Sequence, residues 1–289
     1  MTSAPATVAT PADRPAGRAL LLRQRGSRGT RLPQPNSARR IHRIQRILYP
    51  LILLAALLGL WQYFASGMKN RLLIPTFTEV AGAIIPTLTS GEVWHAMWLS
   101  NQALFLGFGA SILIGVPAGL ALGRFSWLER TTNSYIDILL VLPMAAVIPL
   151  LVAQFGLGLF TRSLVVFLFA FVMIVVNARA GIRSIDPALV EMARSYGGSE
   201  RHVWRFILLP GSVAALLAGA RIGLSRAVTG MIVGELILIP VGIGHLINEY
   251  QGFLKAADLY ALVALVLAES LLLVAVANHL ERKLLSWKQ

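Results

Sequence analysis

The residues of this chain that could carry out chemistry are few, and most of them lie in one polar segment. Residues 191–210, EMARSYGGSERHVWRFILLP, hold two glutamates, three arginines and one histidine between strongly apolar stretches. Each charged side chain costs about 2.5–3.5 kcal/mol at the centre of a bilayer. A segment of this polarity must therefore face water or another protein, and the chemistry it offers is ion pairing and docking.

Patterns for catalysis or metal binding are absent from the sequence. The chain has no cysteine, which excludes disulfides, thiolate nucleophiles and thiolate metal ligands. Its five histidines are scattered, no His-Glu-x-x-His pattern occurs, and none of its four lysines is followed by the serine or threonine of a P-loop. The sequence therefore predicts no enzyme activity, no metal and no cofactor bound by this chain, and any ATP hydrolysis must occur in another chain.

The composition indicates a membrane protein with a basic tail. Of the 289 residues, 56% are hydrophobic and only 13% are charged, whereas a soluble domain carries about 25% charged residues. Much of the net charge of +13 comes from residues 1–46, which hold ten arginines and one aspartate. Because this segment is rich in Pro, Ala, Ser, Thr and Gly, we expect a disordered cytoplasmic tail near lipid headgroups, with no nucleic-acid partner.

Six apolar stretches are long enough to cross a bilayer, which takes about 20 residues of helix. They are residues 47–66, 101–122, 136–156, 161–180, 212–238 and 257–279. A shorter apolar stretch, 77–88, is predicted to form an interfacial helix or a loop. Residues 47–289 are therefore expected to form one transmembrane domain.

The distribution of basic residues predicts the orientation of these spans. With the tail inside, the inner segments hold twenty arginines and lysines, against four in the outer segments: Lys69, Arg71, Arg162 and Lys255. Cytoplasmic loops carry the excess of basic residues in membrane proteins. Both termini are therefore predicted to be cytoplasmic, and so is the polar segment between spans four and five.

Small residues recur every four positions in spans two and five. They are Gly107, Ser111, Gly115, Gly119 and Gly123, and then Ala215, Gly219, Gly223 and Ala227. Such a face lets two helices approach closely in lipid. Two interpretations are open: tight packing within one subunit, or a seam or sliding surface between two copies.

The polar segment is predicted to form two short helices. The Asp-Pro pair at 186–187 is a helix start, with Asp as N-cap and Pro in the first turn. The Gly-Gly pair at 197–198 ends this helix, and Ser199 caps a second helix over 200–208 that ends near Pro210. The mixed composition of the first helix suits docking into a groove of a partner protein. The alternative is an inner loop with no partner.

The same segment resembles the EAA motif of bacterial ABC importer permeases. It has Glu191-Met192-Ala193, then Gly197 after three residues, and Ile207, Leu209 and Pro210 after nine more. Met192 departs from the motif, which usually has alanine there. Four further matches to the nitrate, sulfonate and taurine subgroup extend the resemblance to about residues 70–289: LPMAAVIPLLVAQFG at 142–156, residues 177–186, Gly234-Glu235, and residues 280–283 with Trp287.

This resemblance implies an all-α, polytopic membrane protein with six transmembrane helices in a type I, MetI-like permease arrangement. It implies a homodimer in the bacterial inner membrane, an extracytoplasmic solute-binding protein, and two cytoplasmic ATPase subunits that use ATP and Mg²⁺. The family's coupling loop corresponds to residues 186–210. Its coupling residues are then Glu191, Ala193, Gly197, Gly198, Ile207, Leu209 and Pro210. The resemblance implies a small solute, often an anion such as taurine, another sulfonate, nitrate or bicarbonate, although some members of the family carry neutral or aromatic compounds.

Ionisable residues inside the spans are candidates for substrate contact or internal pairing. They are Asp137, Arg221, Arg226, Glu235 and Glu269. We expect Asp137 and Arg221 to reach water near the cytoplasmic helix ends. Glu235 is expected to pair with another helix, and Glu269 is the candidate partner of Arg226.

Prolines in span three free backbone groups, which membranes tolerate where those groups line a cavity or find partners. The predicted substrate path combines them with nearby polar residues: Pro143, Met144, Pro149, Gln154, Asn177, Arg226 and Glu235. Arg226, a deep cation, suits an anionic solute. The alternative function is a secondary transporter or channel that works without an ATPase, although the sequence shows no inverted repeat of the kind such transporters carry.

Overall fold

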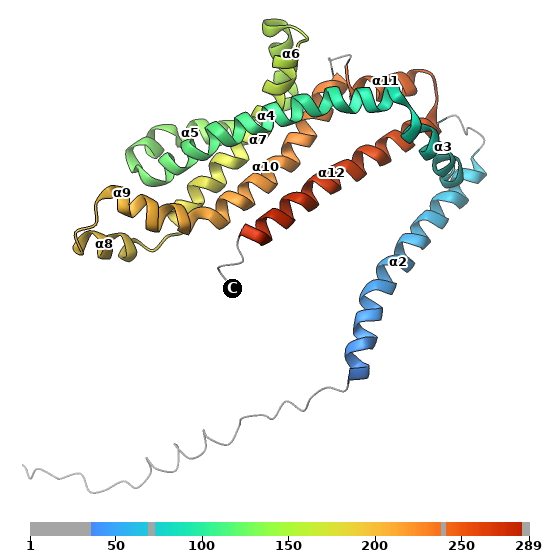
Figure 1. Cartoon of the computed structure of the whole chain (residues 1–289). Helices are drawn as coiled ribbons and strands as arrows, with labels where there is room; N and C mark the ends of the chain where they lie inside the picture. The colour runs from blue at the N-terminus through green and yellow to red at the C-terminus, as the bar shows by residue number, and fades with distance from the viewer. Residues whose placement is uncertain (1–35, 69–72, 238–240, 285–289) are drawn as a thin grey trace, which may run out of the picture. The chain divides into compact units, whose positions relative to one another are not determined.

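The computed structural model describes residues 36–68, 73–237 and 241–284, and every regular element within these ranges is helical (Figure 1). The chain divides into two compact units, residues 1–59 and 60–289, which are considered separately. Most of the predicted disordered tail lies outside the described residues. The first described helix, α2 (Asn36–Gly67), begins within the sequence assigned to that tail.

Five described helices are long and apolar enough to cross a membrane. They contain the segments Leu48–Gly67 of α2, Gly91–Arg124 (α4), Leu159–Arg183 (α7), Glu200–Ile237 and Ala256–Leu284 (α12). The Glu200–Ile237 rod is built from α9 (Glu200–Val203), the π-helix η1 (Trp204–Leu208) and α10 (Leu209–Ile237). The predicted polytopic all-α fold is thus confirmed, with a sixth span only if the bent pair described next is counted as one.

The third predicted span, 136–156, is wrong as a single straight helix. It is divided between α5 (Ser126–Val141) and α6 (Met144–Phe155), whose axes differ by 97°. The break falls at Leu142, whose ψ of 123° is extended. Pro143 explains it, because a proline lacks the N–H for the helical ladder and disfavours helical geometry in the residue before it.

Two short helices flank the long ones. The predicted helix at 77–88 is observed as α3 (Phe77–Thr89), and a capping box between Thr76 and Glu79 fixes its start. Val80 and Ala83 of α3 pack against Ala261 of α12. The helix α11 (Ile243–Gly252) follows α10 and was not predicted.

The small-residue faces of spans two and five pack against α7 inside one subunit. A Cβ atom added to Gly119 of α4 would lie 2.5 Å from the Cβ of Ala178 on α7. On α10, a Cβ atom added to Gly219 would lie 2.6 Å from the Cβ of Asn177, also on α7. These faces therefore form intrasubunit contacts, and their interpretation as a seam between copies is wrong.

Replacing Gly119 with valine should destabilise the protein, because the new side chain must push α4 away from α7. Overpacking of this kind costs about 1–3 kcal/mol, and thermal unfolding of the detergent-purified chain measures it as a lower Tm. Gly109→Val is the matched control, since Gly109 lies on the same helix and a Cβ atom there meets nothing within 4 Å. Equal Tm values for the two variants would contradict the packing described.

Candidate coupling site and intramembrane polar groups

The helix α8 (Pro187–Ser195) has the start and stop predicted from the sequence. The Asp186 carboxylate accepts a hydrogen bond from the Ala188 N–H at 2.9 Å. At the other end, the Gly197 N–H donates to the Arg194 carbonyl and the Gly198 N–H donates to the Ala193 carbonyl, both at 2.9 Å. Gly197 has φ of +80°. This is a Schellman ending, and it requires the left-handed conformation that glycine adopts without strain.

The second predicted helix of the loop does not end near Pro210. It starts at Glu200, passes through η1 and continues as α10. A proline lacks a donor and crowds the carbonyl four residues earlier. The π turn before Pro210, in which the Leu209 N–H meets the Trp204 carbonyl, accommodates this defect without ending the helix.

The helix α8 has one packed face and one exposed apolar face. Val190 and Ala193 pack on a core formed by Leu120, Ile182, Val203 and Leu208. On the adjacent face, the exposed fractions of Leu189, Met192 and Tyr196 are 45%, 52% and 87%. Residues three and four positions apart share a helix face. This exposed apolar row is suited to a groove on another protein.

Glu200 joins three elements beneath the loop. Its carboxylate contacts Arg124 at the end of α4 at 2.8 Å and Arg194 of α8 at 2.5 Å. The carboxylate is about half-exposed, and exposed ion pairs contribute only about 0–1 kcal/mol each. The cluster therefore contributes little to stability, but it fixes the position of α8 relative to α4 and to the start of the Glu200–Ile237 rod.

The remaining predicted coupling residues occupy different environments. Glu191 is exposed and lines a hollow of about 280 Å³ together with Arg124, Arg183 and Arg194. Ile207 and Pro210 are half-buried, while the exposed fraction of Leu209 is 41%. Glu191, Leu209 and the exposed row of α8 are thus open to a partner, whereas Ile207 and Pro210 are half-buried.

Glu235 is buried and joins α10 to three neighbouring helices. Its carboxylate accepts hydrogen bonds from the Ser100 hydroxyl of α4 at 2.7 Å and from the Gly244 N–H of α11 at 3.1 Å. The Arg162 guanidinium of α7 lies 4.0 Å away and donates to the Leu99 carbonyl. The expected pairing of Glu235 with another helix is confirmed.

Glu269 does not pair with Arg226. It accepts a hydrogen bond of 2.5 Å from the Asn101 side chain of α4, so the expected pair is wrong. Arg226 instead lines a hollow of about 220 Å³ beside Met144, and no ion pair to Arg226 occurs within the described ranges. The hollow is otherwise apolar, with leucines, Phe169, Val172 and Met173 in its walls.

The other residues of the predicted path are dispersed. Asn177 packs against Gly219 and donates to the Met173 carbonyl. Pro143, Pro149 and Gln154 are exposed at the start and along the surface of α6. The structure therefore brings Met144 and Arg226 to one hollow, and it places Glu235 in a separate buried cluster.

Comparison with known proteins identifies the family of this chain. Residues 111–286 match the family of binding-protein-dependent transport system inner membrane components. The chain belongs to this family. It is therefore a membrane subunit of the ABC importer type, and the predicted resemblance to ABC importer permeases is confirmed at the level of the family.

Curated relatives cover most of the permease. It is 32% identical over 263 residues to the riboflavin transport system permease protein RibX of Chloroflexus aurantiacus, covering 89% of this chain and 98% of the relative. It is 27% identical over 240 residues to the taurine transport system permease protein TauC of Escherichia coli, covering 81% and 87%. It is 31% identical over 239 residues to the putative aliphatic sulfonates transport permease protein SsuC of the same organism, covering 82% and 91%.

A solved structure shares the fold. The permease is similar to a chain of the MetNI methionine ABC transporter in an inward-facing conformation, with a TM-score of 0.55 and 22% identity. The match covers 66% of this chain and 94% of that chain. The likeness supports the MetI-like arrangement of the helices.

Three site residues of the permease were not singled out in the sequence. Arg124 was counted only as an inner charge, yet it pairs with Glu200. Arg162 was counted only as an outer charge, yet its guanidinium lies 4.0 Å from the Glu235 carboxylate. Ser100 had no signal beyond its polarity. An arginine in the first turn of an apolar helix, such as Arg162 in α7, is the one clue that pointed to a buried partner.

Replacing Glu235 with alanine should lower the stability of the permease strongly. The change leaves the buried Arg162 guanidinium without its counter-charge and the Ser100 hydroxyl without its acceptor, and breaking one side of a buried pair costs about 3–5 kcal/mol. Thermal unfolding in detergent measures the loss. Glu249→Ala is the control, because Glu249 is partly exposed and its one ion pair within the described ranges is with His245, at 3.9 Å. A Tm equal to that of the control would show that the cluster does not stabilise the helix ends.

Proposed function

We propose that this chain is the translocation subunit of an ATP-driven importer, in which α8 receives motion from an ATPase and passes it to the membrane helices. The observation that carries the proposal is the exposed apolar row of Leu189, Met192 and Tyr196 on a helix fixed at both ends. The sequence has no P-loop of its own. ATP and Mg²⁺ are then used by the partner that α8 contacts.

The proposed assembly contains two permease copies, two cytoplasmic ATPase subunits and an extracytoplasmic solute-binding protein. The excess of basic residues supports cytoplasmic termini and a cytoplasmic loop in the bacterial inner membrane. The fold shared with an ABC transporter chain supports this assembly as well. Residues 186–210 form the coupling loop, with Glu191, Ala193, Gly197, Gly198, Ile207, Leu209 and Pro210 as its coupling residues.

The proposed substrate is a small organic anion of the sulfonate or taurine type. Relatives named for taurine and aliphatic sulfonates support this choice. Arg226 supplies one cation in an otherwise apolar hollow, which suits a solute with both an acid group and an apolar body better than nitrate or bicarbonate, which lack apolar surface. Met144, Gln154 and the prolines of α6 extend the path, and Glu235 supports it from the buried cluster.

Replacing Gly197 with valine should reduce uptake below a tenth of the wild-type rate while the protein remains in the membrane. A β-branched residue disfavours φ of +80° by about 1–2 kcal/mol or more, so the end of α8 must change shape. Uptake of radiolabelled solute into cells measures the effect. Gly82→Val is the control, since a Cβ atom at Gly82 meets nothing within 4 Å. Wild-type uptake by Gly197→Val would favour the alternative, a secondary transporter or channel.

Replacing Arg226 with methionine should lower uptake of an anionic solute at least tenfold, because the hollow then has no cation to offset desolvation of the acid group. Arg226→Lys keeps the charge and should retain part of the uptake. Initial rates over a range of taurine and alkanesulfonate concentrations provide the measurement. If both variants transport as the wild type does, Arg226 lies off the path.

A further inference from the structure

The helix α10 presents a polar face that its own compact unit leaves uncovered. Between residues 212 and 236, its exposed positions are Ile222, Ser225, Arg226 and Thr229. Residues three and four positions apart share a helix face, so these four positions form one continuous strip. Three of the four side chains are polar, and one of them is charged. Ser225, Arg226 and Thr229 are called the polar face of α10.

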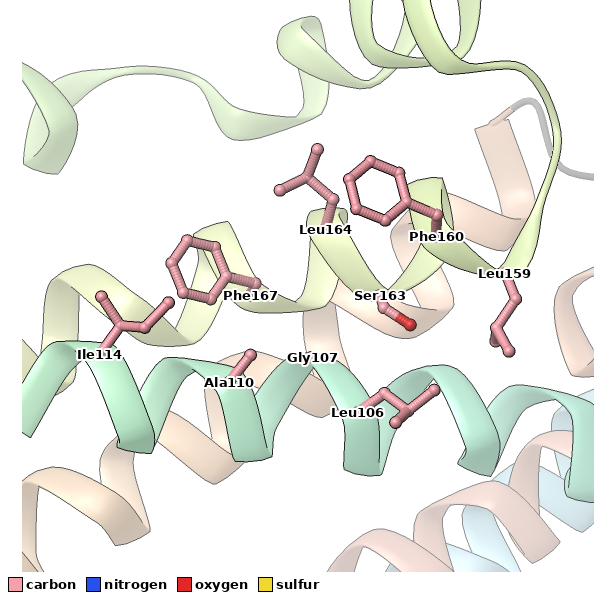
Figure 2. A pocket seen from close by; sticks show the side chains of 9 residues that line it. All are labelled: Leu106, Gly107, Ala110, Ile114, Leu159, Phe160, Ser163, Leu164 and Phe167. Atoms are coloured by element: carbon pink, nitrogen blue, oxygen red, sulfur yellow. The ribbon is translucent and has the colours of Figure 1, made fainter.

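The other long helices of residues 60–289 expose apolar residues in the middle of their spans. Every exposed position of α4 between residues 101 and 122, and of α12 between residues 261 and 276, holds glycine or an apolar residue. Between residues 161 and 180, α7 exposes only Ala180. Figure 2 shows part of this surface, where Ser163 is the one polar residue among the nine that line a hollow between α4 and α7. Such surfaces suit lipid chains, and the polar face of α10 does not.

The charge of the polar face lies far from both ends of α10. Arg226 is seventeen positions after Leu209 and eleven before Ile237, which is about 26 Å and about 17 Å along the helix. Only cationic side chains near the end of a span extend to interfacial water. Arg221, on the same helix, contacts Glu281 at 3.5 Å, whereas no ion pair to Arg226 occurs within the described ranges. Hydrocarbon is therefore an unfavourable cover for this face.

The two hydroxyls beside Arg226 can donate to an anion. Ser225 donates to the Arg221 carbonyl at 3.3 Å, and Thr229 donates to the Ser225 carbonyl at 3.0 Å. Both bonds lie within one helix, and a hydroxyl hydrogen rotates toward the acceptor that is present. A guanidinium donates to two oxygens of an acid group at once. The remaining oxygen of a sulfonate is then free to accept from a hydroxyl.

Contact of this face with the same face of a second copy is unfavourable. A two-fold axis brings equivalent residues together, so the two Arg226 guanidinium groups would approach each other. None of the four exposed positions holds a carboxylate to offset their repulsion. A hydrated anion in front of the face offsets it and also pairs with the cation.

We propose that Ser225 and Thr229 line the translocation path together with Arg226 and bind the acid group of the solute within the membrane. The proposal rests on the translocation function proposed above and adds two solute-binding residues to it. Arg226 supplies the charge and the two hydroxyls supply neutral donors. Met144 and Phe169, which line the hollow beside Arg226, contact the apolar body of the solute.

Cysteine labelling tests whether the polar face is open to water, and the absence of native cysteine gives a clean background. Full-length Ser225→Cys is treated in sheared membrane fragments, where a charged reagent reaches both membrane surfaces but not the lipid interior. The reagent is sulfonatoethyl methanethiosulfonate, itself a small sulfonate. Modification should be at least tenfold faster than for two controls, Leu113→Cys, 76% exposed on the apolar surface of α4, and Leu224→Cys, buried on α10.

The charge preference of the labelling tests whether the face receives an anion. The comparison reagent carries a trimethylammonium group on the same methanethiosulfonate, and each rate is divided by that reagent's rate with a free thiol in solution. On this scale the sulfonate reagent should modify Ser225→Cys at least threefold faster than the cationic one. Adding Arg226→Met should abolish the preference.

Three labelling outcomes would overturn the proposal. Equal rates for Ser225→Cys and Leu113→Cys show that lipid or protein covers the face. A disulfide between the Ser225→Cys residues of two differently tagged copies, without labelling, assigns the face to a contact between copies. Fast labelling without a charge preference shows a water-filled space that does not select anions. ATPase-dependent uptake by the wild-type chain leaves the proposed function standing in all three cases, whereas its absence contradicts the proposed function itself.

Removal of both hydroxyls provides a second measurement. The double variant Ser225→Ala with Thr229→Val keeps Arg226 and nearly the same side-chain volumes. The maximal rate of radiolabelled taurine uptake should fall at least fivefold, with an unchanged amount of protein in the membrane. Ser270→Ala is the control, because Ser270 also lies within a span and donates to a carbonyl of its own helix, that of Val266, at 2.7 Å. Equal uptake by the double variant and the control would contradict contact of the two hydroxyls with the solute.

Discussion

The close approach of α4 and α10 to α7 is the constraint on which the rest of this structure depends. In lipid, helices gain little by burying apolar surface against each other, so their contact relies on dense packing. Gly119 and Gly219 supply it, since neither position has room for a Cβ atom. With α7 held on both sides, Arg162 at its one end reaches the Glu235 cluster, while Arg183 at its other end pairs with Glu129 of α5. The polar groups at both ends are positioned by the same apolar contact.

The coupling loop uses this rigid core as its base. The turn at Gly197 ends α8, and the Glu200 carboxylate joins α8 to α4 by contacting Arg194 and Arg124. Val190 and Ala193 pack α8 onto the apolar core beneath it. Because η1 lets the helix pass Pro210, Glu200 begins a rod of 38 residues that ends at Ile237. Such a rod is about 57 Å long. Motion imposed on α8 is thereby connected to the helix that carries both Arg226 and Glu235.

Much of this architecture follows from local patterns in the sequence. The long spans, the Asp186 cap and the Gly-Gly stop depend on residues close together in the chain, and all of them were predictable. The bend at Pro143 and the continuation through Pro210 were not, because a proline can break, bend or be absorbed by a helix according to its surroundings. The pairing of Glu235 with Ser100 joins residues 135 positions apart. For the same reason, the sequence did not predict that Glu269 bonds to Asn101 rather than to Arg226. Partners on different helices depend on packing that no single segment encodes.

The central claim is that the exposed face of α8 binds an ATP-hydrolysing subunit. Co-purification of that subunit with tagged permease from membranes tests it most directly, comparing the wild-type chain with Met192→Glu, which places a charge in the middle of the apolar row. Thr131→Glu, on the exposed surface of α5, controls for added charge. The account predicts that the wild type and Thr131→Glu retain the ATPase and that Met192→Glu loses most of it. Full retention by Met192→Glu, or no ATPase with the wild type, would contradict the account.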